Sequence, residues 1–341
     1  MDLPTEFPNL TTKSAVATAG DAEYYMNGYD IIVHRTVLSK GPKEHLQPES
    51  YVCRFCGRSR PEANFKKFNA HAISHLTGNN TLFSLYECRT CNARFSGYEA
   101  DLGTLTLLDR QAAQVLGKDG VPSAKTSLKK SRIDFKEGGL VIQEHEGDPI
   151  ALIDEINKTM TISTMKRSYR PLGVYKSLLK MAATLLDQAD VDKIPEAIKW
   201  LGSDGLTENQ IDDGTGYTCL RTFTPGMAPF GQTRVMILRR KNKSIVGPAY
   251  IFFLAYGCTS FQIVLPAPQE DRHLVGQTFD LHPIPLIAFL KMDRVFGKTR
   301  THFEKLGSTE LTPAPPSIVY HFESIDAVEI PNSQSGEPPN A

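Results

Sequence analysis

The pattern of apolar positions divides the second half of the chain into a helical part and a part made of strands. Between residues 174 and 186, apolar side chains recur at the three- and four-residue spacing of an amphipathic helix, and 194–201 predicts a second, short helix. The pattern then changes. Runs of β-branched and aromatic residues, bounded by Gly, Pro or charged residues, predict strands at 233–239, 249–255 and 260–266. This region is therefore expected to be an α+β domain.

Shorter patterns predict further strands. Segments 132–135 and 140–142 flank the sequence Lys-Glu-Gly-Gly, which predicts a hairpin because glycine tolerates the positive φ of a tight turn. A third strand is expected at 159–164, and a short one at 30–34. The run at 251–254 is wholly apolar, which is typical of a strand buried on both faces.

Length and composition favour more than one folding unit. With 341 residues and a mass of 37.8 kDa, the chain exceeds the size at which one core usually stops growing. The hydrophobic content of 40% can fill a core, and no apolar run reaches the roughly 18 residues of a membrane helix, so a cytoplasmic protein without a membrane partner is expected. The 38 basic residues balance the 38 acidic ones, yet binding to nucleic acid needs only a local basic patch.

Cysteine spacing predicts a metal site. Two C-x-x-C pairs are formed by Cys53, Cys56, Cys88 and Cys91. Each C-x-x-C turn supplies two thiolates from one tight loop, so the two pairs together provide the four soft ligands of a tetrahedral structural Zn²⁺. A disulfide framework would suit a small secreted domain, whereas this chain is long and shows no signal-peptide pattern. The isolated Cys219 and Cys258 are expected to be buried as small apolar residues.

The segment between the two cysteine pairs carries His and Asn side chains in a compact order. A short strand ending in His71 is followed by a Gly-Asn-Asn loop at 78–80 and by C-x-x-C-N at 88–92, which is expected to open a helix. In this order and spacing, residues 51–103 resemble the HNH endonuclease family, particularly the members in which two C-x-x-C pairs clasp the active site around zinc. The resemblance implies a ββα-metal fold over less than a sixth of the chain.

The resemblance also implies a role for each matching residue. His71 would be the general base that activates water, since a histidine with a pKa near its usual value of about 6.5 can accept a proton at neutral pH. Asn79 or Asn80 would orient His71 through its other ring nitrogen. Asn92 would bind the catalytic Mg²⁺ or Mn²⁺. The four cysteines would hold the structural zinc, because about fifty residues bury too little surface to fix catalytic geometry alone.

The chain departs from the family pattern at three positions. Ala70 stands where many members have a metal-binding Asp or His, Ser74 replaces the proline of the H-x-x-P stretch, and Phe83 replaces an asparagine. The catalytic ion therefore lacks one expected ligand. Candidates to replace it are His75, Glu99 and Asp101.

Basic residues on and just after the first cysteine pair are candidates for contact with phosphate. They are Lys66, Lys67, Arg54 and Arg58. The function expected from the resemblance is hydrolysis of DNA by a metal-dependent endonuclease, in the context of restriction or antiphage defence. The alternatives are a non-catalytic zinc module that binds nucleic acid or a protein partner, and a nuclease controlled by a nucleotide messenger.

The predicted organisation is a small zinc-stapled ββα-metal module followed by a separate α+β domain. The boundaries are an N-terminal extension (1–50), the module (51–105), a linker and hairpin region (106–165), the α+β domain (166–330) and a disordered tail (331–341). The α+β domain would position substrate, bind a regulatory ligand or form a homodimer.

Overall fold

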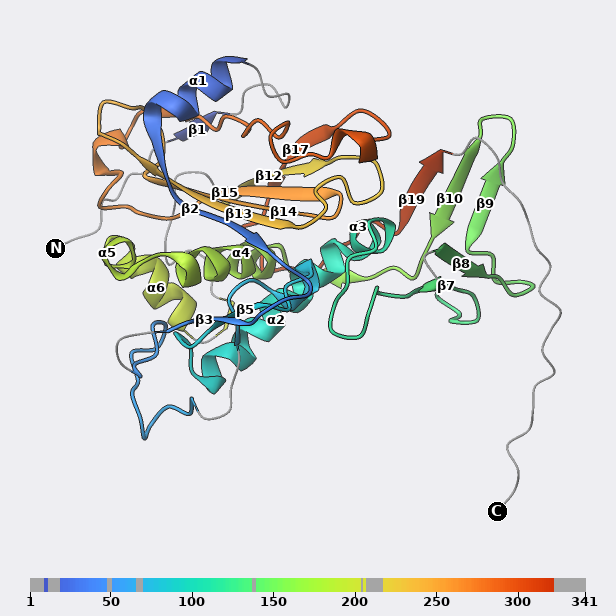
Figure 1. Cartoon of the computed structure of the whole chain (residues 1–341), viewed down its shortest axis with the longest axis horizontal. Coiled ribbons are helices and arrows are strands. Elements are labelled where there is room, and N and C mark those ends of the chain that lie inside the picture. The colour runs from blue at the N-terminus through green and yellow to red at the C-terminus, as the bar shows by residue number, and fades with distance from the viewer. Residues whose placement is uncertain are drawn as a thin grey trace.

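A computed structural model describes residues 9–11, 19–47, 51–65, 70–136, 139–203, 205–206 and 217–321. The prediction of a mixed α+β chain is confirmed (Figure 1). The predicted disordered tail, 331–341, lies outside the described residues. Within these ranges, none of the helices combines the length and the apolar content that crossing a bilayer demands.

A six-stranded antiparallel sheet forms the largest unit of the molecule. In spatial order its strands are β17 (Arg300–Lys305), β12 (Thr218–Phe223), β15 (Thr259–Val264), β14 (Tyr250–Tyr256), β13 (Thr233–Arg240) and β2 (Tyr29–Val37). The three strands predicted at 233–239, 249–255 and 260–266 are β13, β14 and β15.

Both faces of this sheet are covered, which explains the apolar run in β14. Phe252 and Leu254 point into the core shared with α4 (Pro171–Leu185), whereas Ile251 and Phe253 point into a second core with Tyr25. Figure 1 shows α1 (Ala19–Gly28) on one side of the sheet and α4 on the other. Alternate residues of β14 therefore face two apolar layers, and the predicted double burial is confirmed.

Helix α4 is buried around its whole circumference. It is sandwiched between the sheet and α2 (Arg89–Leu105), and it carries two lysines, Lys176 and Lys180, that are almost inaccessible to solvent. The short helices α5 (Gln188–Val191) and α6 (Pro195–Gly202) follow it. Both predicted helices are confirmed as α4 and α6, and Trp200 on α6 is buried in the core.

The cysteine-containing region folds as a small sheet against a helix. Strand β5 (Leu82–Ser84) pairs in antiparallel fashion with β4 (Ala70–His71) and in parallel with β3 (Glu44–Leu46). The 3₁₀ helix η1 (His75–Thr77) lies between β4 and β5, and α2 follows β5. The second cysteine pair therefore lies at the start of the helix of a β-β-α unit.

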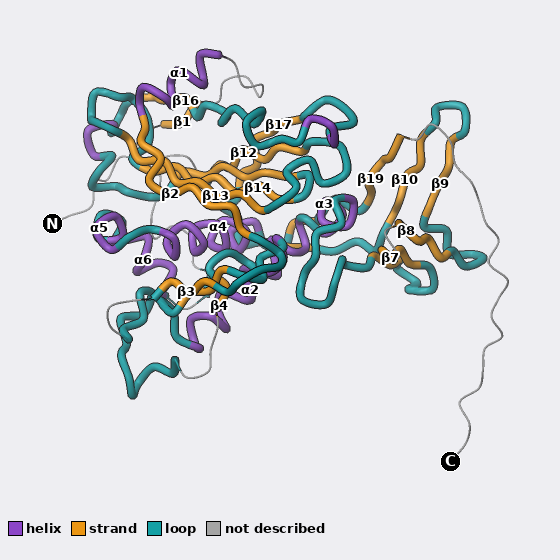
Figure 2. Tube along the Cα trace, viewed as in Figure 1, coloured by secondary structure: helices purple, strands orange, loops and turns teal. Residues whose placement is uncertain are grey.

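The remaining strands form small sheets. The hairpin β7 (Arg132–Lys136) and β8 (Gly139–Gln143) forms where it was predicted, with β6 (Ala124–Lys125) on its edge. Strand β10 (Thr159–Ser163) lies between β9 (Ala151–Asp154) and β19 (Ser317–His321) in an outlying unit (Figure 2).

Short elements complete the described chain. They are β1 (Asn9–Thr11) paired with β16 (Thr278–Asp280), β11 (Ser168–Tyr169) paired with β18 (Thr312–Pro313), α3 (Leu107–Ala112), η2 (Arg272–Leu274) and η3 (Met292–Arg294).

The predicted boundaries do not separate independent packing units. Strand β2 comes from the predicted N-terminal extension, yet it pairs along β13 and forms one edge of the large sheet. Strand β3 comes from the same segment and joins the small sheet of the cysteine region. One continuous apolar core runs from the cysteines through α4 into the large sheet. Pairing between strands so distant along the chain leaves no local signal in the sequence.

Candidate metal centre and histidine site

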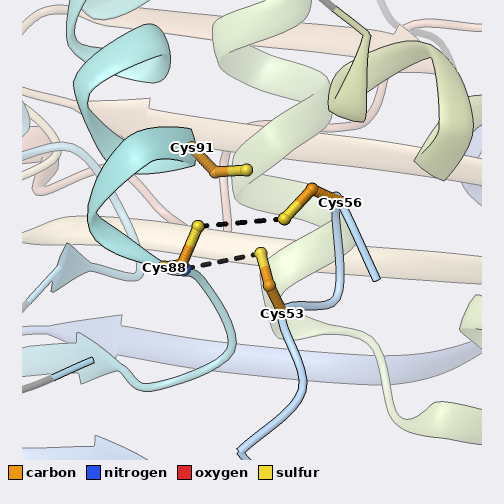
Figure 3. Close-up of side chains that lie close together, drawn as sticks. All are labelled: Cys53, Cys56, Cys88 and Cys91. Carbon is orange, nitrogen blue, oxygen red and sulfur yellow. Dashed lines mark hydrogen bonds between the residues drawn. The ribbon is translucent and has the colours of Figure 1, made fainter. Parts of the chain in front are cut away.

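Four thiols converge where the two C-x-x-C turns meet. Figure 3 shows the side chains of Cys53, Cys56, Cys88 and Cys91 pointing toward one another, and their ligand atoms all lie within 4.8 Å of one another. The first pair lies on a turn, whereas Cys88 caps α2 and Cys91 lies in its first helical turn. All four are free thiols rather than disulfides.

The spacing of the sulfur atoms suits a tetrahedral ion. The Sγ atoms of Cys56 and Cys88 are 3.8 Å apart. This matches the edge of roughly 3.8 Å in a tetrahedron whose Zn–S bonds are about 2.3 Å long, whereas a disulfide bond measures about 2.05 Å. The backbone N–H of Cys88 also donates to Cys53 Sγ at 3.4 Å, as expected for a thiolate. The cluster could therefore hold a metal ion, and its donor set is compatible with structural zinc.

His71 lies at the end of β4, opposite Phe83 of β5. Its ring centroid is 4.7 Å from that of Phe83 and 4.7 Å from that of His75. Burial, together with smaller electrostatic effects of His75, Lys180 and Lys43, lowers the pKa of His71 to about 4. The imidazole is therefore neutral at pH 7, which is the state that a general base requires.

The asparagines of the β4–β5 loop do not orient His71 as predicted. The fully buried Asn79 side chain donates to the carbonyl groups of Ile73 and Leu82 and accepts from two backbone N–H groups, which include that of Leu82. These four bonds hold the loop together and occupy the amide. Asn80 Oδ1 instead contacts Nε2 of His75. The orienting role predicted for Asn79 is therefore wrong, because its amide satisfies buried backbone groups.

The residues proposed as ligands of a catalytic ion do not form a preassembled set. Asn92 is half-buried in the first turn of α2 and accepts a hydrogen bond from Ser96 through its main-chain carbonyl. Glu99 accepts from the hydroxyl of Ser74, and Asp101 accepts from the backbone N–H of Arg170. Among the described residues, the cysteines are the only group of three or more His, Cys, Asp or Glu donors close enough to share an ion, so His75 belongs to no such group.

The four residues predicted to contact phosphate lie in different environments. Lys66 and Lys67 lie outside the described residues. The Arg54 guanidinium donates to the carbonyl groups of Ala183, Thr184 and Leu186 at the end of α4 and stacks on Tyr86. These contacts give Arg54 a structural role, and the phosphate contact predicted for it stays a prediction. Arg58 is exposed, and its Nε donates to Cys56 Sγ at 3.5 Å.

A buried ion pair under His71 was not anticipated from the sequence. Lys180 Nζ of α4 lies 2.9 Å from Glu87 Oε1 and donates to the carbonyl oxygen of His71 at 2.9 Å. Both side chains of the pair are at most 1% exposed. Burial raises the pKa of Glu87 to about 7, and Lys180 opposes that rise. The available signal was the presence of two lysines, Lys176 and Lys180, in a helix whose other side chains are mostly apolar.

His45 is the second site residue that sequence reasoning missed. Strand β3 brings it beside Phe83 on the edge of the small sheet, with the two ring centroids 5.4 Å apart and nearly parallel. His45 precedes the first cysteine and lies in the predicted extension, so no motif includes it.

Comparison with family models gives no match for the chain. Comparisons with curated proteins and with solved structures give none either.

Proposed function

We propose that the protein is an endonuclease of the HNH type that hydrolyses phosphodiester bonds of DNA, with His71 as the general base. The observation that carries the proposal is the position of His71. It ends the first strand of a β-β-α unit whose helix begins at the second pair of a four-cysteine cluster.

The electrostatics of the site keep the proposed base in its neutral form. A neutral imidazole can accept a proton from water as the water attacks phosphorus, and the lowered pKa keeps His71 in that form at neutral pH. His75 is held by Asn80, and the carbonyl of His71 is held by Lys180. These contacts hold the side chain of His75 and the main chain of His71 before substrate arrives.

The described side chains fit a catalytic Mg²⁺ only in part. Asn92 and His75 are candidate donors, but the carboxylates that Mg²⁺ usually prefers are engaged elsewhere, at Ser74 and Arg170. We therefore assign no step to such an ion, and the metal requirement becomes a variable of the experiment. The zinc-binding cysteines would have a structural role, because they position α2 and the loop before it.

Cleavage of supercoiled plasmid DNA tests the proposal. The parent protein should nick the plasmid in Mg²⁺ or Mn²⁺, and His71→Ala should slow nicking about 10² to 10⁴-fold, the usual effect of removing a general base. His145→Ala is the matched control, because His145 is exposed and lies in the outlying β region. Parallel reactions without added Mg²⁺ or Mn²⁺, in which the structural zinc is kept, measure the requirement for a catalytic ion.

Equal rates for the parent and His71→Ala proteins would remove His71 from the mechanism. DNA binding without any cleavage would instead support the non-catalytic zinc module. The incomplete set of donors for a catalytic ion specifically favours that alternative.

A further inference from the structure

Three aromatic rings lie side by side across the small sheet. Phe83 of β5 is the register partner of both His45 on β3 and His71 on β4. Register partners on neighbouring strands point to the same face of a sheet. The ring distances agree, with centroids 5.4 Å apart for His45 and Phe83 and 4.7 Å apart for His71 and Phe83. His45 therefore shares a face with the proposed base.

Lys43 brings positive charge to the same face. Its Nζ lies 5.5 Å from the centroid of the Phe83 ring, and its side chain is exposed. No ion pair among the described residues engages Lys43 or His45. Both side chains are therefore available to a ligand from solution.

The acidic residue between them does not neutralise this charge. Glu44 lies between Lys43 and His45 in sequence, and side chains alternate between the two faces of a strand. The Glu44 carboxylate pairs with Arg35 Nη1 at 2.6 Å. Deeper carboxylates are also engaged, since Glu87 pairs with Lys180. A lysine and two imidazoles thus share a face, and the carboxylates of Glu44 and Glu87 already have partners elsewhere.

We propose that Lys43 and His45 bind a phosphate of the DNA backbone and hold it against His71. This inference deepens the proposed function and rests on it for the role of His71. An ammonium group supplies charge to the phosphate oxygens, and an imidazole N–H can donate a hydrogen bond to them. The segment before the first cysteine pair is then part of the nucleic-acid site rather than an extension.

Binding of a fluorescent duplex DNA, measured by anisotropy without added Mg²⁺ or Mn²⁺ and without chelator over a series of salt concentrations, tests the inference without cleavage. Lys43→Gln should weaken binding and reduce the slope of log K against log salt by about one, the value for one lost phosphate contact. His45→Phe should also weaken binding while keeping an aromatic ring against Phe83. Lys298→Gln is the control, because it removes the same charge from an exposed position beside β17, on the far edge of the large sheet.

Steady-state cleavage adds a second readout. Loss of a phosphate contact that is made before the chemical step should raise KM in Lys43→Gln with little change in kcat, whereas His71→Ala should lower kcat. The inference would be overturned if Lys43→Gln bound DNA with the same affinity and the same salt dependence as the parent. It would also be overturned if the parent did not bind DNA. If the parent binds DNA through Lys43 but never cleaves it, the phosphate site stands and the nuclease proposal fails. If the parent cleaves DNA while Lys43→Gln and His45→Phe bind and cleave like the parent, the nuclease proposal stands and the phosphate site fails.

Discussion

The cysteine region and the large sheet achieve order by different means. The sheet buries apolar side chains on both faces, in two separate cores. The cysteine region has strands of two or three residues, and it depends on a four-thiol cluster, a buried ion pair and a fully hydrogen-bonded asparagine. The difference shows that polar contacts and a thiol cluster that could hold a metal ion supplement the apolar core that the cysteine region shares with α4, because strands so short bury little surface by themselves.

Helix α4 connects the two regions. Its core-facing apolar residues pack under the sheet, where Tyr175 donates to the carbonyl of Val264 at 2.8 Å. Its other side sends Lys180 to Glu87 and to the carbonyl of His71. The cysteine region also closes on α6, where a Cβ at Gly202 would collide with the carbonyl oxygen of Phe55. The proposed active site is thus built onto the domain that follows it.

Removal of the metal should give the largest difference between the two regions. Structural zinc contributes about 10–16 kcal/mol of apparent binding free energy in zinc-finger peptides, and Cys88→Ser removes one ligand. We expect about one zinc per parent chain by elemental analysis. In Cys88→Ser, hydrogen exchange should show lost protection at 51–105 while β13 and β14 remain protected.

Cys219→Ser is the matched control for this experiment, because Cys219 is buried in β12, outside the cluster. It should keep its zinc. A metal-free protein that is protected throughout residues 51–105 would show that the thiols pack without an ion, and the contrast between the regions would disappear.

The two buried lysines of α4 should differ in their contributions to stability. Lys180→Met leaves Glu87 buried without its cation, and breaking such a pair typically costs about 3–5 kcal/mol. The Lys176 ammonium instead approaches the carbonyl groups of Trp200 and Gly205, and no carboxylate among the described residues pairs with it. Lys176→Met should therefore cost less, about 1–3 kcal/mol.

Chemical denaturation of the single variants measures this difference in unfolding free energy. A double variant tests whether the cost comes from the unpaired carboxylate. Replacing both partners of a buried pair with apolar residues is often neutral, so Lys180→Met combined with Glu87→Leu should recover much of the lost stability. Equal costs for Lys176→Met and Lys180→Met would mean that the ion pair has no special role in joining α4 to the cysteine region.

The sequence predicted elements whose signals are local and strong. Helical spacing over 174–186 predicted α4, and the apolar run at 249–255 predicted β14. The C-x-x-C spacing predicted the thiol cluster. These patterns depend on neighbours within a few residues. The pairing of β2 with β13 and of β3 with β5 depends on distant partners, so the first strands were assigned to an extension.

Side-chain roles were predicted less well than elements. Asn79 and Asn80 are identical in type and adjacent, yet one bonds to the backbone and the other contacts His75. Their division of roles depends on where the loop carbonyls point, which only the folded chain determines. Likewise the local pattern predicts Lys180 only as part of an amphipathic helix, because its buried carboxylate partner, Glu87, lies far away in the sequence.

Arg54 and Arg58 offer the finest test of the comparison, since both lie on the first cysteine turn. The Arg54 guanidinium binds three carbonyl groups at the C-terminal end of α4, where a cation also complements the helix dipole. Arg54→Met should therefore cost about 2 kcal/mol in unfolding free energy, the scale of hydrogen bonds to a charged group. Arg58→Met should stay within about 0.5 kcal/mol of the parent, because Arg58 is exposed.

DNA binding should show the opposite order for these two arginines. Arg58 is exposed and donates to Cys56 Sγ through Nε, so its terminal nitrogens can meet phosphate. Arg58→Met should therefore weaken binding and lower its salt dependence, whereas the folded fraction of Arg54→Met should bind like the parent. Urea denaturation and anisotropy on the same preparations measure both quantities. If Arg54→Met kept the parent's free energy of unfolding but bound DNA more weakly, Arg54 would be a phosphate contact as the sequence predicts. The first cysteine turn would then contact α4 through its packing alone, with no cation at the end of the helix.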